Sequence, residues 1–222
     1  IQNSGTFVTT PTANEVNNLT LNNTAGNTTT GVTLQQPIAV AGVLTLTSGH
    51  ITTDATNILT MNAGSNVAGQ NYGTRVPGST DNSFVNGPMS KVGTTAFLFP
   101  VGKLNRGGHF CGISAPSPST TFTAEYIRNT AHSQGAITAS GLLQISNCEF
   151  WTINRTGSSA VDVTLSWNGN SNCNAAAYVN TLASLTIAHN NGTSWNTHGG
   201  STDAGSAAPQ GSITWTGVNT FS

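Results

Sequence analysis

Short runs of alternating apolar and polar residues extend along most of the chain, and clusters of Gly, Asn, Ser and Pro separate them. No segment keeps apolar residues at positions i, i+3, i+4 and i+7 for three turns, as an amphipathic helix would. Alternation with a period of two places successive side chains on opposite faces of a strand. The pattern therefore predicts an all-β fold.

Residues 1–80 carry short strands at fairly even spacing. Leu44 and Leu46 alternate with Thr45 and Thr47, and comparable runs before and after them end at small polar turns. Strands this short and this regular favour a β-solenoid, in which each coil stacks on the next. The repeat is irregular, and an ordinary antiparallel meander remains the alternative.

The remainder of the chain changes rhythm twice. Residues 81–104 predict a β-hairpin connection, with the turn residues Asn86-Gly87-Pro88 and Gly93-Thr94-Thr95 between its strands. In residues 105–222 the strands are longer, and the run from Val161 to Trp167 alternates most clearly. Strands of this kind separated by turn signals predict a β-sandwich domain.

The amino-acid composition excludes two kinds of partner, nucleic acids and the membrane interior. Charged residues make up 6% of the 222 residues, and the formal net charge is -1. Six Lys and Arg are too few to follow a phosphate backbone, so we expect no nucleic-acid partner. No run of about 18 apolar residues occurs, so we expect no membrane insertion. The chain opens without Met or a basic segment, and we expect a processed chain or a piece of a longer one.

Several motifs resemble a known group of proteins. They are Phe84–Gly93, Phe97–Lys103, Cys148–Trp151, Val163–Trp167 and Thr193–Trp195. Together they resemble large secreted surface proteins of Bacteroidetes that carry a C-terminal sorting domain for type IX secretion. The resemblance extends over residues 16–222, and the end of the chain is similar to the region just before the sorting domain. It implies an extracellular or cell-surface location and an adhesin-like architecture, and it brings no catalytic motif. The run from Gly108 to Gly112 departs from the family pattern, and no role transfers to it.

The chemistry of an enzyme is hard to find in this sequence. A glycosidase needs two carboxylates that face one cleft, and only seven acids exist. No Gly-x-Ser-x-Gly elbow is present. His109 and Cys111 alternate on one predicted strand, and we interpret them as a strand-end histidine beside a buried thiol rather than as metal ligands. We therefore predict no enzyme, no cofactor, no metal and no catalytic residues.

Aromatic residues are the remaining candidates for ligand binding. Each of the four Trp stands in a strand-like run, where core packing is its usual role. Trp195 and His198, close to Gly199-Gly200, are the pair that we expect to face a ligand.

The odd number of cysteines predicts one free thiol. We expect a disulfide between Cys148 and Cys173, with Cys111 free, because Cys148 and Cys173 both stand near Asn and Ser beside strand-like runs. A disulfide also favours an oxidising compartment.

Three functions remain open from the sequence. The first is an extracellular structural or adhesive surface protein, a component of a larger assembly or filament, whose partners are copies of itself or neighbouring modules. The second is a carbohydrate-binding module, with a glycan as partner. The third is an ice-binding protein, suggested by Thr45 and Thr47 on one flat face.

Overall fold

The computed structural model describes residues 5–7, 14–24, 31–169, 171, 178–203, 205–207 and 210–221. These residues form strands and loops, apart from two short 3-10 turns at Ala131–Gln134 and Leu182–Ser184. The prediction of an all-β fold is confirmed. No described helical segment is long and apolar enough to cross a membrane.

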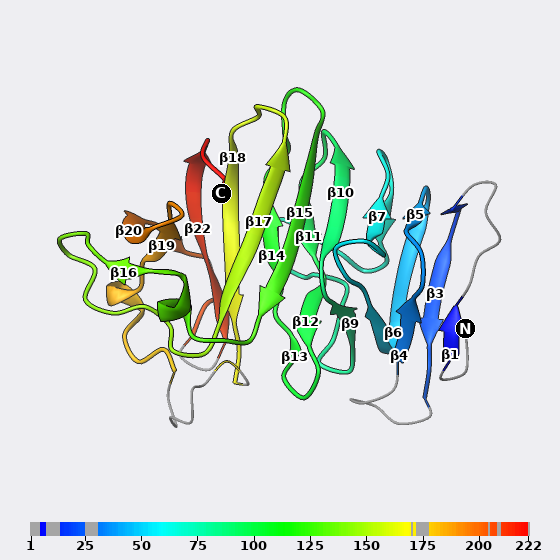
Figure 1. The fold of residues 1–222 in the computed structure, drawn as a ribbon, viewed down its shortest axis with the longest axis horizontal. Coiled ribbons are helices and arrows are strands. Elements are labelled where there is room, and N and C mark those ends of the chain that lie inside the picture. Colours follow the sequence, from blue (N-terminus) through cyan, green and yellow to red (C-terminus); the bar gives the residue numbers. More distant parts are fainter. Residues whose placement is uncertain are drawn as a thin grey trace.

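Three ladders of parallel strands extend from the blue side of the molecule to the green strands β10 and β12 near its middle (Figure 1). The first contains β1 (Gly5–Phe7), β4 (Gly31–Leu34), the second half of β6 (Val43–Thr52), β9 (Ser83–Asn86) and β12 (Val101–Lys103). The second contains β2 (Glu15–Val16), β5 (Ile38–Val40), β7 (Leu59–Met61) and β10 (Met89–Gly93). The third contains β3 (Leu19–Asn22), the first half of β6 and β8 (Asn66–Val67). The chain therefore visits the ladders in the same order on successive turns.

Parallel register stacks apolar side chains in columns inside these ladders. Leu19, Leu44 and Val67 occupy matching positions on β3, β6 and β8, and all three are buried. Burying an aliphatic side chain of this size stabilises the fold by roughly 1.5–3 kcal/mol. The alternation seen in the sequence thus selects the inward face, and the stacking of equivalent positions selects the register.

The predicted hairpin at 81–104 is wrong. Strands β9 and β10 flank the turn at Gly87 but do not pair with each other. Val85 of β9 pairs in parallel with Val101 of β12, and Met89 of β10 pairs in parallel with Leu59 of β7. All four residues of β9 are buried, which is typical of a strand covered on both faces. With φ of 130°, Gly87 turns the chain from one sheet into another.

The second part of the molecule is built from longer antiparallel strands. β15 (Thr120–Ile127) pairs with β10 on one side and with β17 (Phe150–Thr156) on the other. A five-stranded sheet follows the order β11 (Phe97–Phe99), β14 (Cys111–Ile113), β18 (Val161–Trp167), β22 (Gly211–Val218) and β21 (Ser201–Thr202). A three-stranded sheet follows the order β16 (Ala136–Ile137), β20 (Ser194–Gly199) and β19 (Ile187–Asn190). The short β13 (Gly107–Gly108) pairs with β12.

The two parts share a sheet and a core. The six-stranded sheet has the order β17-β15-β10-β7-β5-β2, because β10 pairs in parallel with β7 and antiparallel with β15. One cluster of buried apolar side chains extends from Leu19 to Val218. Both strand pairing and core packing therefore continue across the predicted boundaries at residues 81–104.

Candidate binding groove

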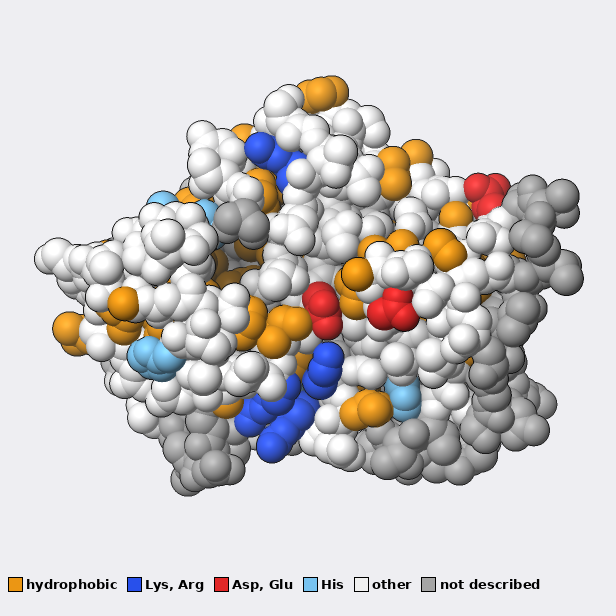
Figure 2. Space-filling model, viewed as in Figure 1, with side chains coloured by type: hydrophobic (Ala, Val, Ile, Leu, Met, Phe, Trp, Pro, Cys, Tyr) orange, Lys and Arg blue, Asp and Glu red, His pale blue; other side chains and the backbone are white. Residues whose placement is uncertain are grey.

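Two adjoining cavities, of about 210 and 250 Å³, open beside strand β17. They share six lining residues: Phe150, Trp151, Leu165, Ile187, Ala188 and Trp195. We call the space that these six residues line the β17–β19 groove. The front view shows a hollow with hydrophobic side chains at its base between the parts that carry β17 and β19 (Figure 2).

Edge strands form the two sides of this groove. In the described part of the chain, β17 is the last strand of the six-stranded sheet, and β19 is the last strand of the three-stranded sheet. The floor comes from the five-stranded sheet, through Leu165 of β18 and residues of β22 that line one cavity or the other. The five-stranded sheet therefore lies beneath the opening between β17 and β19.

Two indole rings are fixed in the walls by hydrogen bonds to backbone carbonyls. Nε1 of Trp151 donates to the carbonyl oxygen of His109 at 3.1 Å, and Nε1 of Trp195 donates to that of Ala131 at 3.0 Å. Buried indoles normally satisfy their N–H group in this way. The two rings are thus held by bonds within the chain, and both line the two cavities.

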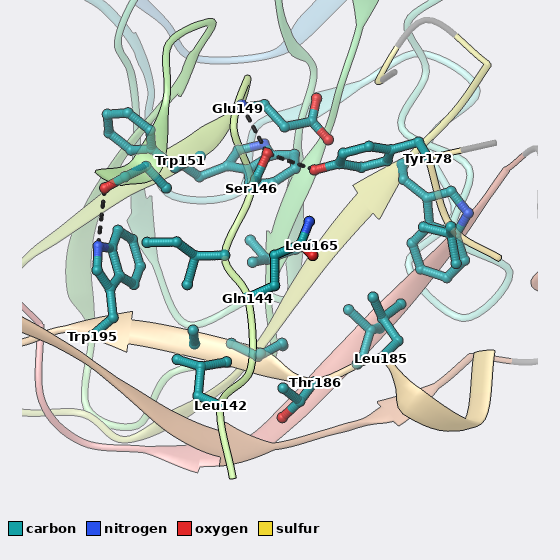
Figure 3. A pocket seen from close by; sticks show the side chains of 18 of the residues that line it. Leu142, Gln144, Ser146, Glu149, Trp151, Leu165, Tyr178, Leu185, Thr186 and Trp195 are labelled. Atoms are coloured by element: carbon teal, nitrogen blue, oxygen red, sulfur yellow. Dashed lines mark hydrogen bonds between the residues drawn. The ribbon is translucent and has the colours of Figure 1, made fainter. Parts of the chain in front are cut away.

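The cavity nearest the 131–150 segment has one polar side (Figure 3). The hydroxyl of Tyr178 donates to Oγ of Ser146 at 2.7 Å, and the backbone N–H of Glu149 donates to the same oxygen at 3.0 Å. Leu142, Leu185 and Trp195 line the same cavity, as Figure 3 shows. Most of the lining is therefore apolar.

Beside this polar side lies a buried cluster of ionisable groups. The hydroxyl of Tyr126 donates to Oε2 of Glu149 at 2.7 Å. Nε2 of His109 and Nη1 of Arg128 each lie 3.8 Å from the same oxygen. The side chains of His109 and Glu149 are 0% and 1% exposed. Glu149 and His109 are thus buried side by side, with one guanidinium nearby.

Burial shifts the two pKa values in opposite directions. It raises the pKa of Glu149 to about 7 and lowers the pKa of His109 to about 4, because each group loses hydration of its charged form. The His109 ring stacks on Tyr126 at 4.4 Å. Nδ1 of His109 lies 3.3 Å from the carbonyl oxygen of Gly107, and Nε2 has no hydrogen-bond partner among the described residues. The pair is arranged to hold one proton at mildly acidic pH.

The structure separates the two predicted ligand-facing residues. Trp195 is buried, with 8% of its surface exposed, and it lines both cavities as a wall. Its Nε1 is bonded to the carbonyl oxygen of Ala131 inside the small apolar cluster of the 131–150 segment, and its role toward a ligand stays a prediction. His198 is exposed and lines neither cavity; it stacks on Trp215 with ring centroids 4.1 Å apart.

The cysteines are only partly described. Cys111 is free and buried, as predicted. Cys148 is buried, and its Sγ lies 3.1 Å from the carbonyl oxygen of Ser171, two positions before Cys173. Cys173 itself lies outside the described residues, so the Cys148–Cys173 disulfide stays a prediction.

Sequence reasoning missed most of the groove. Glu149 carried one usable signal, since it is an acid placed directly before the apolar run Phe150-Trp151. Ile187 and Ala188 carried none, because a strand edge depends on which strands pair. In the described residues, no group of three or more His, Cys, Asp or Glu side chains could hold a metal ion.

Comparison with known proteins found no match: no family model, no curated protein and no solved structure matches the chain.

Proposed function

We propose that this chain is a non-enzymatic, extracellular surface module that joins a larger assembly through the β17–β19 groove. The observation that carries the proposal is the pair of edge strands on either side of an apolar opening. Isolated soluble proteins usually protect their strand edges with charges. Thirteen charged residues, six basic and seven acidic, are few for a chain with this many strands.

We infer that the parallel ladders form a β-solenoid and that the antiparallel part forms a β-sandwich. Support for the solenoid comes from the repeated order in which the chain visits three parallel ladders. Support for the sandwich comes from Phe122 of β15 and Val163 of β18, which belong to one core although their strands lie in different sheets. Because the core is continuous, the solenoid would serve as a stiff spacer for the groove.

Absence of catalysis is part of the same proposal. Glu149 is the only Asp or Glu among the described residues that line either cavity. Retaining and inverting glycosidases both require a second carboxylate across the cleft.

A location experiment tests this function. Intact cells that produce the protein are labelled with an antibody against the folded chain and then treated with a protease that cannot enter them. Labelling of intact cells and loss of the label after proteolysis are expected. Label that appears only after the cells are permeabilised would contradict a surface role.

Carbohydrate binding is the second candidate, and one specific observation favours it. The exposed ring of His198 stacks on Trp215, which lines one of the two cavities, with 20° between the ring planes. An exposed aromatic ring at a cavity suits the apolar face of a sugar ring. Binding of neutral oligosaccharides that is lost in Trp215→Ala would establish this function.

Ice binding has less support. Thr20 and Thr45 occupy matching positions on β3 and β6. The next position of this column follows Val67, the last residue of β8, and holds Ala68 instead of a threonine. The threonine column therefore stops after two coils. Thermal hysteresis in a freezing solution would nevertheless revive this alternative.

A further inference from the structure

We propose that the β17–β19 groove accepts an extended, uncharged peptide strand of a partner protein. The inserted strand would pair with β17 and thereby extend the six-stranded sheet toward the three-stranded sheet. This inference rests on the proposed function, because it names the element through which the module joins its assembly.

The first argument is the hydrogen-bonding capacity of β17. In an antiparallel strand, every second residue directs its N–H and C=O groups to one side. The inner side of β17 pairs with β15 over its full length, from Phe150 to Thr156. On the outer side, no strand of the described chain pairs with β17. The edge therefore presents a row of donors and acceptors that a peptide backbone can satisfy.

The second argument is the floor beneath that edge. Leu165 of β18 lines both cavities, and Val163 and Val218 line the second. An engineered apolar cavity of about 150 Å³ already holds a benzene molecule. Cavities of about 210 and 250 Å³ can each hold one apolar side chain of a strand above them. Alternate side chains of an inserted strand point to the same face, so two of them can enter the two cavities.

The third argument distinguishes a peptide from a saccharide. A sugar placed in the groove would turn many hydroxyls toward an aliphatic floor, and each buried hydroxyl without a partner is costly. A peptide can form hydrogen bonds and bury apolar groups at the same time, because its backbone pairs with the strand edge while its apolar side chains face the floor. The apolar character of Leu165, Ile187 and Ala188 therefore favours a peptide.

The fourth argument concerns the charge of the partner. Among the described residues that line the two cavities, Glu149 is the only Lys, Arg, Asp or Glu. Its carboxylate already accepts a hydrogen bond from Tyr126. On the visible face, charged side chains are few and gather mostly at the lower centre (Figure 2). A charged peptide would leave water without compensation. The fitting sequence alternates small apolar residues with Thr or Ser.

The experiment compares three peptides and two oligosaccharides. The first peptide is a fluorescein-labelled heptapeptide in which valine alternates with threonine. The second has the same sequence with N-methyl groups at alternate residues, which removes the backbone donors of one edge. In the third, aspartate replaces each valine. Cellotetraose and laminaritetraose test for saccharides. Binding is measured by fluorescence anisotropy for the peptides and by calorimetry for the sugars.

Two tryptophan substitutions provide a matched pair. Ala188→Trp places a large side chain at a position that lines both cavities, and Leu143→Trp places the same side chain at a position that is 95% exposed and lines neither. We expect Ala188→Trp to weaken binding of the first peptide at least tenfold and Leu143→Trp to leave it unchanged. Near-ultraviolet circular dichroism checks that both variants fold.

Amide hydrogen exchange of the unmodified protein gives a second measurement that needs no variant. The first peptide should slow exchange in residues 150–156, and the N-methylated and aspartate peptides should bind at least tenfold more weakly. Equal binding of the N-methylated peptide would overturn strand insertion and leave an apolar pocket. Binding of an oligosaccharide without the peptide would also overturn it, in favour of the carbohydrate alternative. No peptide binding and no slowed exchange at millimolar concentration would refute the inference while leaving the cell-surface experiment unaffected.

Discussion

Replacing Glu149 by glutamine should expose a pH dependence that the native protein conceals. Glu149 and His109 lie 3.8 Å apart with almost no exposed surface. Glutamine keeps the shape of the side chain and can still accept the hydrogen bond from Tyr126. The substitution therefore removes a titrating group and leaves its surroundings nearly intact.

The two groups act on stability in opposite directions. The pKa of Glu149 is raised from 4.5 to about 7, so its contribution to stability is full below pH 4.5 and is lost as the pH rises to 7. The pKa of His109 is lowered from 6.5 to about 4, so its contribution is full above pH 6.5 and is lost as the pH falls to 4. A separation of about 2.5 pH units corresponds to about 3 kcal/mol for either group. Between pH 4.5 and 6.5 the two slopes cancel.

Urea denaturation from pH 4 to pH 7.5 measures the effect. In Glu149→Gln only the histidine remains, so the free energy of unfolding should fall by about 3 kcal/mol relative to wild type as the pH goes from 7 to 4. In His109→Phe, which keeps an aromatic ring against Tyr126, it should fall by a similar amount as the pH rises from 4.5 to 7.

Glu125→Gln is the matched control, because Glu125 is a carboxylate of β15 that is partly exposed and pairs with Lys103 at 3.5 Å. Its stability curve should run parallel to that of wild type, since exposed ion pairs contribute little. Parallel curves for all three variants and wild type would refute the argument that the buried pair shares one proton.

Three further predictions concern the core and the cysteines. Leu44→Ala should lower the free energy of unfolding by about 2–5 kcal/mol and retain a single transition by tryptophan fluorescence and circular dichroism, because the core is continuous; two separate transitions would contradict this. Lys91 is buried, and burial lowers its pKa to about 8. The free energy of unfolding of wild type should therefore rise by about 3 kcal/mol relative to that of Lys91→Met between pH 8 and 10.5. A difference between the two proteins that does not change with pH would exclude the shift. Non-reducing mass mapping should find a peptide that joins Cys148 to Cys173. Cys111 should react with a thiol reagent only after unfolding, because burial raises the pKa of its thiol. Fast labelling of Cys111 in the folded protein would contradict this prediction.

The strands themselves were largely predictable from alternation. In β15 the residues Phe122, Ala124 and Tyr126 face inward and are fully buried, as their spacing predicts. The Leu44 and Leu46 run also faces inward. Alternation works here because one face of each strand is buried and the other is not, so the side-chain period reports the burial.

Strand partners were not predictable in the same way. The turn at Asn86-Gly87-Pro88 carries a hairpin signal, but the strands on either side carry apolar residues on both faces. Such strands can be covered by neighbours on every side, and a local turn does not decide which neighbour comes next. The same ambiguity concealed the continuity of the six-stranded sheet, because β10 is parallel to one partner and antiparallel to the other.

The groove was hidden from the sequence for a related reason. Trp151 and Ile153 on β17 alternate like residues of any half-buried strand, and nothing in that spacing states that β17 is the last strand of its sheet. An edge is a property of the whole topology, whereas alternation is a property of a few residues. The low charge of the chain was the one global signal, because charged side chains are the usual protection of an open edge. That signal favours association, and among the described strands β17 is the last one of its sheet. The two observations are independent, so an inserted strand is favoured by both the composition and the fold.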